Sequence, residues 1–127
     1  MVEKRQVYKC LVCGIVAEVL DVGAGQLICC GQPMRLMAPR DEPDAMHELV
    51  IEPDGSSVTV RVGSGGPHPM EPGHHVQWIE LFANCVAQKL PLTAGDEPEA
   101  YFPLVAGEAQ IRVFCNVHGL FERTTKI

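Results

Sequence analysis

Four cysteines near the N-terminus constrain the fold more than any other feature of the chain. Cys10 and Cys13 lie in the stretch YKCLVCG, and Cys29 and Cys30 stand side by side in LICCGQPM. A Cys-x-x-Cys turn lets two thiolates face one ion while amide groups of the turn point at the sulfur atoms. Neighbouring side chains on a regular strand point to opposite faces, so the backbone must bend for the second pair to reach the same ion. Gly31 supplies that freedom.

A set of four thiolates suits tetrahedral iron or zinc, and this geometry does not choose between the two metals. A structural zinc knuckle is one alternative. A redox disulfide is a weaker one, because no strand–helix–strand pattern surrounds Cys10 and Cys13. The segment MVEKRQVYKC is charged and resembles no secretion signal, and no apolar run has the length of a membrane span. We therefore expect a cytoplasmic protein without a membrane partner, whose thiols stay reduced and bind metal.

Composition narrows the fold class and the partners. The formal net charge is −6 with only 10 Lys and Arg, so a basic stripe for nucleic acid is absent and nucleic acid is not an expected partner. Aromatic residues make up 6% of the chain, and 12 Gly with 10 Pro favour short strands and turns over long helices. We expect a mostly-β protein.

The chain is predicted to contain two domains of unequal length. Residues 1–37 form a small metal domain built around the four cysteines, residues 38–45 (APRDEPDA) form a linker interrupted by two prolines, and residues 46–127 form the second domain. Short apolar segments recur along the second domain, at 48–53, 56–63, 75–82, 85–92, 100–105, 109–115 and 119–124. Seven short strands at this spacing predict a small antiparallel β-sandwich.

All five histidines lie beyond the predicted linker. They are His47, then His68, His74 and His75 in HPMEPGHHVQW, and finally His118, which shares the stretch CNVHG with Cys115. Four neutral imidazoles and one thiolate would leave an open sixth position on iron, where a redox metal meets a small substrate. His75 follows His74 at the start of a strand and should face away, so we do not expect it to be a ligand.

Five stretches together identify a family resemblance over nearly the whole chain. YKCLVCG, CCGQPM, VGSGGPHPM, HHVQWIEL and CNVHGL resemble the desulfoferrodoxin family, the two-iron form of superoxide reductase. The resemblance implies a desulforedoxin-like domain with an Fe(Cys)4 centre, followed by an immunoglobulin-like β-sandwich that carries a second, square-pyramidal iron. It assigns the first iron to Cys10, Cys13, Cys29 and Cys30. It assigns the second to equatorial His47, His68, His74 and His118 with axial Cys115.

The activity implied by the resemblance is superoxide detoxification by a cytoplasmic oxidoreductase. Ferrous iron donates one electron to superoxide, two protons are taken up, and hydrogen peroxide leaves. The Fe(Cys)4 centre is a candidate electron relay, zinc can substitute in it, and a rubredoxin or another small redox protein is the expected electron donor. The resemblance also implies a homodimer. Ferrous iron with one thiolate and four neutral imidazoles carries a local charge of about +1, which favours an anionic substrate.

The chain departs from the family at the loop before His47. Most members have Glu-Lys-His there, with a lysine that attracts superoxide and a glutamate that ligates the resting ferric iron. Here Ala45 and Met46 occupy these positions. Asp44 or water would then hold the sixth position, and we favour water.

This departure opens alternative functions. The first is a non-catalytic electron-transfer or metal-storage protein that keeps the fold and the irons. The second is a zinc-stabilised interaction module. Retention of all five predicted ligands of the second iron favours the reductase. Cys85 lies far from any motif, in a strand-like segment, and is expected to be a small buried hydrophobe.

Overall fold

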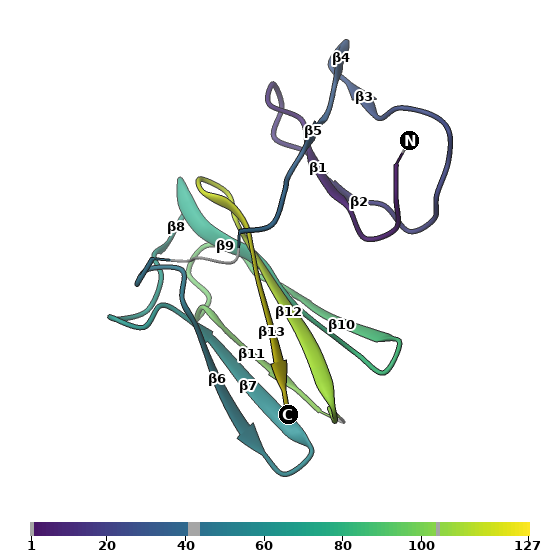
Figure 1. Cartoon of the computed structure of the whole chain (residues 1–127). Coiled ribbons are helices and arrows are strands. Elements are labelled where there is room, and N and C mark those ends of the chain that lie inside the picture. Colours follow the sequence, from purple (N-terminus) through teal and green to yellow (C-terminus); the bar gives the residue numbers. More distant parts are fainter. Residues whose placement is uncertain (1, 41–43, 104) are drawn as a thin grey trace. The chain divides into compact units, whose positions relative to one another are not determined.

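The computed structural model describes residues 2–40, 44–103 and 105–127. The chain divides into two compact units, Met1–Ala38 and Pro39–Ile127, and each consists of antiparallel strands (Figure 1). Of the linker predicted at 38–45, residues 41–43 lie outside the described residues, so its boundaries stay a prediction. Among the described residues we find no helix with the length and apolar character needed to cross a membrane.

The first unit is built from five very short strands. They are β1 (Val7–Lys9), β2 (Val16–Glu18), β3 (Ile28–Cys29), β4 (Gln32–Pro33) and β5 (Arg35–Leu36). β1 pairs with β2 on one side and β5 on the other, and β3 pairs with β4 in a separate hairpin. Val7 and Cys10 are almost fully buried, whereas most other apolar side chains of this unit are at least partly exposed. A core this small gives a metal centre an obvious role in stabilising the unit.

The second unit is a sandwich of two antiparallel sheets (Figure 1). Its strands are β6 (Leu49–Asp54), β7 (Ser57–Val62), β8 (Met70–Glu71), β9 (His74–Ala83), β10 (Val86–Pro91), β11 (Glu99–Phe102), β12 (Glu108–Cys115) and β13 (Gly119–Lys126). One sheet has the order β10-β9-β12-β13, with β8 added to β9, and the other has the order β11-β7-β6. The prediction of a mostly-β protein is therefore confirmed.

Alternating apolar residues form the core between the two sheets. Val58, Val60 and Val62 of β7 are all buried, and so are Ile111 and Val113 of β12, while their sequence neighbours on β7 are more exposed. Burial of each such side chain contributes about 1.5 to 3 kcal/mol to the free energy of folding. This period-two pattern is the feature that predicts the sandwich.

Antiparallel pairing brings the predicted ligands of the second metal to shared strand ends. Leu49 at the start of β6 pairs with Val62 at the end of β7, so the segments that carry His47 and His68 adjoin. Cys115 at the end of β12 pairs with Val76 near the start of β9. The strand ends thus gather residues that are up to 71 positions apart, since 118 − 47 = 71.

Cys85 differs from its prediction. It is exposed, and it lies with Asn84 in the two-residue turn that joins Ala83 of β9 to Val86 of β10. Both turn residues have positive φ, 51° for Asn84 and 62° for Cys85. This is the conformation of a type I′ hairpin turn, whose second position is ordinarily glycine. Cys85 thus lies between two strands rather than within one, and it is exposed, so the burial prediction was wrong.

A buried ion pair crosses the sheet that contains β9 and β12. Glu80 is 1% exposed and Arg112 is 5% exposed. Glu80 Oε1 accepts from Arg112 Nε at 2.8 Å and lies 2.7 Å from Arg112 Nη2, while Lys89 Nζ lies 3.4 Å from Glu80 Oε2. Removing one partner of such a pair leaves an uncompensated charge in the protein interior.

We predict that Glu80→Ala lowers the free energy of unfolding by about 3 to 5 kcal/mol, because Arg112 then stays buried without its carboxylate. Urea unfolding of the metal-loaded protein measures this change. Glu99→Ala is the matched control, because Glu99 pairs with Arg61 at 2.9 Å but both side chains are about half exposed. That control should cost about 1 kcal/mol or less. Equal losses in the two variants would contradict the prediction.

Candidate metal centres

A tight turn after β1 presents Cys10 and Cys13. The Cys10 amide donates to the Ile15 carbonyl at 2.9 Å, and the Gly14 amide donates to the Cys10 carbonyl at 2.9 Å. Gly14 has φ +86°, which closes the turn without a side-chain clash. The Cys13 amide points at Cys10 Sγ at 3.5 Å. This is the arrangement expected of a metal knuckle, with an amide directed at a sulfur.

A second turn brings the adjacent cysteines to the same place. Cys29 ends β3 and pairs with Gln32, so Cys30 and Gly31 form a two-residue turn. Both have positive φ, 54° and 73°. The backbone therefore bends where the sequence required it, with the left-handed conformation at Cys30 as well as at the glycine.

The four sulfur atoms fit one tetrahedral ion. Cys13 Sγ lies 3.5 Å from Cys29 Sγ, and Cys29 Sγ lies 3.9 Å from Cys30 Sγ. All four lie within 4.8 Å of one another. A tetrahedron with metal–sulfur bonds of about 2.3 Å has sulfur–sulfur edges of about 3.8 Å. The observed spacing matches such an ion.

The thiols of this cluster compete for protons. The hydrogen bond from the Cys13 amide lowers the pKa of Cys10 to about 6. The hydrogen bond with the Cys13 side chain raises the pKa of Cys29 to about 12, and Cys13 also raises the pKa of Cys30. Without a cation, Cys29 and Cys30 are protonated at neutral pH. Metal binding must therefore release protons, and the metal affinity should rise with pH.

The second cluster is a closed ring of four imidazoles in the sandwich unit. His47 lies 4.9 Å from His68 and 4.7 Å from His118 between ring centroids, and His74 lies 4.8 Å from His68 and 5.0 Å from His118. Each ring therefore adjoins two others, with His47 opposite His74 and His68 opposite His118. Four imidazoles arranged in this way could surround and hold one metal ion.

Cys115 belongs to the same cluster. Its Sγ lies 3.7 Å from His118 Nδ1, and the donor atoms of His47, His74, Cys115 and His118 all lie within 4.8 Å of one another. His68 joins this group through its ring contacts with His47 and His74. Cys115 is fully buried. The structure thus brings together every residue predicted for the second site.

Three buried nitrogen atoms in this cluster have no hydrogen-bond partner among the described residues. They are the Nε2 atoms of His47, His68 and His74. The Nδ1 atoms of two of these rings are already engaged, in His47 with Asp44 Oδ1 at 2.8 Å and in His68 with the Pro69 carbonyl at 2.7 Å. Each acceptor holds the ring proton on Nδ1 and leaves the lone pair of Nε2 directed at the cluster. A metal ion satisfies these atoms, so the cluster fits iron.

Burial favours the neutral form of His47 and of His68. His47 is 1% exposed and His68 is 2% exposed, and burial lowers the pKa of both below the ordinary histidine value. The hydrogen bond to His47 lowers the pKa of Asp44, so that carboxyl group is ionised at neutral pH. A neutral imidazole is the form that binds metal.

A β-bulge decides which of the two adjacent histidines faces the cluster. The register between β9 and β12 shifts between Phe114 and Cys115, because Trp78 pairs with Phe114 and Val76 with Cys115. Val76 and Ile79 both belong to the core although they are three positions apart. Regular alternation from Ile79 would have turned His75 toward the core side. The bulge instead turns His74 there, which is a common use of bulges beside functional sites.

Asn116 ties the turn that carries Cys115 to the start of β9. Its side-chain Oδ1 accepts from the His75 backbone amide at 2.8 Å, and its backbone amide donates to the His75 carbonyl at 3.2 Å. Its Nδ2 also donates to the Gly73 carbonyl at 3.2 Å. The segments on both sides of His74 are thereby fixed against the turn. The sequence indicated CNVHG as a ligand motif but did not indicate this bracing role.

The loop that carries His68 is tightly folded against the loop that carries His47. The Gly63 amide donates to the Glu48 carbonyl at 2.8 Å, and the Ser64 amide donates to the Ala45 carbonyl at 2.8 Å. Gly63 has φ +105°, and a Cβ there would lie 2.1 Å from the Gly66 carbonyl oxygen. Only glycine fits this position.

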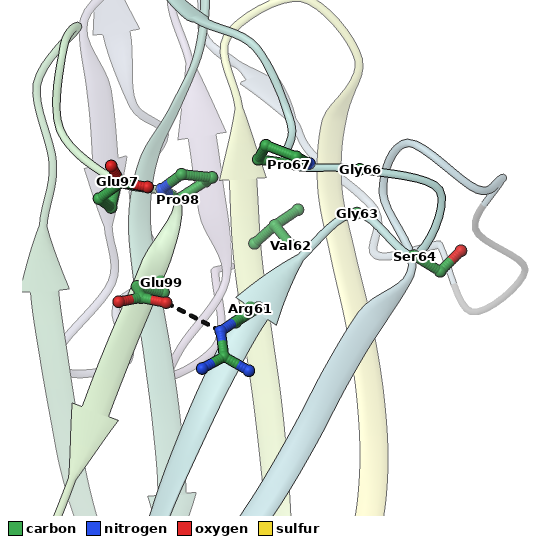
Figure 2. Close-up of a pocket in the computed structure, with 9 residues that line it drawn as sticks. All are labelled: Arg61, Val62, Gly63, Ser64, Gly66, Pro67, Glu97, Pro98 and Glu99. Atoms are coloured by element: carbon green, nitrogen blue, oxygen red, sulfur yellow. Dashed lines mark hydrogen bonds and ion pairs between the residues drawn. The ribbon is translucent and has the colours of Figure 1, made fainter.

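A hollow of about 330 Å³ lies on the outer side of this loop (Figure 2). Two of its charged lining residues pair with each other, since Arg61 Nε donates to Glu99 Oε2 at 2.9 Å. It contains none of the clustered histidines or cysteines.

The charged residues Glu48 and Arg40 lie near His47, and each contacts a residue outside the metal cluster. Glu48 Oε2 accepts from Ser64 Oγ at 3.3 Å, and the Arg40 guanidinium lies 5.6 Å from the centre of the Phe121 ring. Met46 is 40% exposed. Asp44, one of the two candidates for the sixth position, contacts the outer nitrogen of His47.

Comparison with known proteins agrees with this geometry. The family model for the desulfoferrodoxin N-terminal domain matches residues 2–37, and the desulfoferrodoxin model matches residues 43–124. A desulfoferrodoxin homolog of Methanothermobacter thermautotrophicus is 46% identical over 124 residues, 95% of this chain and 99% of that protein. A desulfoferrodoxin of Syntrophotalea carbinolica is 49% identical over 123 residues, 95% of this chain and 97% of that protein.

Solved structures show the same architecture. The superoxide reductase from Treponema pallidum superposes with a TM-score of 0.77 at 25% identity, covering 96% of this chain and 99% of that one. The four-cysteine cluster and the cluster of four histidines with one cysteine match two iron centres. Matches over both units, at this level of identity, show that the chain belongs to the desulfoferrodoxin family.

Proposed function

We propose that this protein is a superoxide reductase, which converts superoxide to hydrogen peroxide by one-electron reduction. The observation that carries the proposal is a set of three buried Nε2 atoms that have no hydrogen-bond partner among the described residues and lie with His118 and the Cys115 thiol. The proposed ligands of the iron that reacts with superoxide are His47, His68, His74 and His118 with Cys115. Cys10, Cys13, Cys29 and Cys30 hold the other iron. Iron bound at the histidine cluster supplies one electron to superoxide, which takes up two protons and leaves as hydrogen peroxide.

The residues around the cluster set the conditions for this reaction. Neutral imidazoles add no charge, and Cys115 is the single anionic ligand, so a ferrous centre keeps a net charge of about +1 that attracts superoxide. His74 and His118 are only half-buried, which leaves the cluster accessible from solvent. Ala45 and Met46 carry no titratable proton, so the two protons come from water at this surface.

Iron held by the four cysteines would supply electron-relay chemistry, and superoxide reduction itself would not depend on it. The electron donor is a small redox protein such as a rubredoxin. As the family resemblance implies, the protein works in the cytoplasm as a homodimer. The second candidate function is non-catalytic electron transfer or metal storage. One observation supports it, the replacement of the usual Glu-Lys pair by Ala45 and Met46.

Product stoichiometry tests the proposal. The iron-loaded, reduced protein should release one hydrogen peroxide for each superoxide and no dioxygen. Dismutation would also release dioxygen, and a storage protein would leave superoxide to decay at the rate seen without protein. The zinc-loaded protein is the control, because zinc has no redox chemistry. Peroxide formation no faster than in that control would overturn the proposal.

We predict that Cys115→Ser abolishes most of the peroxide release and the visible charge-transfer band of the ferric site. A serine hydroxyl stays protonated and donates far less electron density than a thiolate, so the ferric state loses its anionic ligand. Absorption spectra and peroxide assays measure both effects. Cys85→Ser is the matched control, because Cys85 is exposed in the β9–β10 turn. Full turnover by Cys115→Ser would contradict the proposal that Cys115 is a ligand of this iron.

We predict that Cys13→Ser removes the first metal centre but leaves superoxide reduction at the second. Cys13 Sγ lies 3.5 Å from Cys29 Sγ, and a hydroxyl there binds iron poorly. Metal analysis should show one iron lost per chain, while the remaining ferrous site is still oxidised by superoxide. If the variant retains its second iron and no longer reacts, the first centre is an obligatory relay.

We predict that Met46→Lys speeds superoxide capture by roughly threefold to a hundredfold at low salt. A unit charge about 6 Å from an anion contributes about 0.7 kcal/mol in water and nearer 3 kcal/mol at an effective dielectric constant of about 20. Higher ionic strength should reduce the gain, because the Debye length is about 8 Å at 0.15 M salt. Rapid-mixing or pulse-radiolysis rates across a salt series measure it, with Met46→Gln as the uncharged control. Equal rates in the two variants would show that another cation already acts there.

A further inference from the structure

Asp44 makes a direct contact with one of the four clustered imidazoles. Its Oδ1 lies 2.8 Å from His47 Nδ1 and also accepts from the His47 backbone amide at 3.0 Å. The Asp44 side chain is 67% exposed, whereas the His47 side chain is 1% exposed. A solvent-facing carboxylate therefore holds the outer nitrogen of a buried ligand.

The partner of His47 differs in charge from the partner of His68. His68 Nδ1 lies 2.7 Å from the Pro69 carbonyl oxygen, which is a neutral acceptor. His47 Nδ1 has a carboxylate in the same role. Both acceptors hold the proton on Nδ1 and direct Nε2 at the cluster, but an anionic acceptor draws that proton more strongly. It gives the imidazole partial imidazolate character and makes Nε2 a stronger electron donor.

Asp44 is not the only group that holds the His47 ring among the described residues. Phe121 stacks on this ring with centroids 4.3 Å apart and an interplanar angle of 11°. The ring is thus fixed by packing on its face, as well as by the hydrogen bond at its edge. The distinct contribution of Asp44 is its negative charge on the outer nitrogen of a metal ligand.

We propose that Asp44 is a positioning residue that acts through His47 to favour the ferric over the ferrous state of the bound iron. Negative charge and stronger nitrogen donation both stabilise the more positive metal ion, so Asp44 lowers the reduction potential of the site. The inference rests on the proposed iron site and on His47 as its ligand. It gives this chain, which carries Ala45 and Met46 before His47, an acidic group that acts from outside the ligand shell.

The test is the reduction potential of iron-loaded Asp44→Asn. The amide keeps an oxygen acceptor for both His47 hydrogen bonds and removes only the charge. We expect the preference for ferric iron to fall roughly tenfold, a positive shift of about 59 mV for a one-electron couple. Iron content and charge-transfer intensity should not change. A potential equal to that of the unmodified protein would overturn the inference.

Glu48→Gln is the matched control. Glu48 directly follows His47, carries the same charge as Asp44, and hydrogen-bonds Ser64 Oγ at 3.3 Å rather than an imidazole. If the effect travels through His47, Asp44→Asn shifts the potential and Glu48→Gln shifts it much less. Equal shifts in the two variants would show a general charge effect and would overturn the role assigned to Asp44.

A second measurement uses the unmodified protein and needs no activity. With zinc in the histidine site, nitrogen–proton NMR spectra should show a His47 Nδ1 proton that is protected from solvent exchange and shifted further downfield than that of His68. Asp44→Ala should remove the protection. An unprotected or absent His47 signal in the unmodified protein would overturn the inference. A normal signal and potential shift with no superoxide reduction would instead overturn only the proposed enzyme activity.

Discussion

The histidine cluster of the second unit is organised around buried donor atoms that a metal cation would satisfy. Three imidazole Nε2 atoms are buried without hydrogen-bond partners among the described residues, and a fully buried thiol lies against the same cluster. Leaving a buried nitrogen atom unsatisfied costs about 1 to 3 kcal/mol. The rest of the unit directs these atoms at one point: strand pairing gathers the loops, the β9 bulge selects His74 over His75, and Gly63 lets the His68 loop fold closely.

The two centres differ in how the fold positions the residues that can bind metal. The four-cysteine centre lies in a unit with few buried side chains, and its ligands come from two short turns whose backbone is held in left-handed conformations. The histidine centre is built on a sandwich with a large apolar core, so its ligands rest on long strands and braced loops. The first arrangement suits electron transfer at a closed site. The second keeps one accessible side for a small substrate.

Much of the fold and of the two metal clusters could be predicted from the sequence, wherever a short motif implies a local geometry. The Cys-x-x-Cys spacing of Cys10 and Cys13 predicted a knuckle, Gly31 after Cys30 predicted the bend, and alternating apolar residues along β7 predicted the sandwich. Other features depend on contacts between distant segments. Two-residue strands such as β8 have too few residues to show a period, Cys85 looked like part of a strand until pairing placed it in a turn, and nothing in the sequence indicates that Asp44 points at His47 Nδ1.

The most direct test of the account is pulse radiolysis of the reduced, iron-loaded protein with superoxide. We expect each superoxide to oxidise one ferrous histidine site, the charge-transfer band of the ferric thiolate site to appear, and hydrogen peroxide to form in equal amount. The zinc-loaded protein should give none of these signals. If the ferrous site stays reduced while superoxide decays at the rate of the zinc-loaded control, this chain keeps the fold and the irons of its family without the reaction.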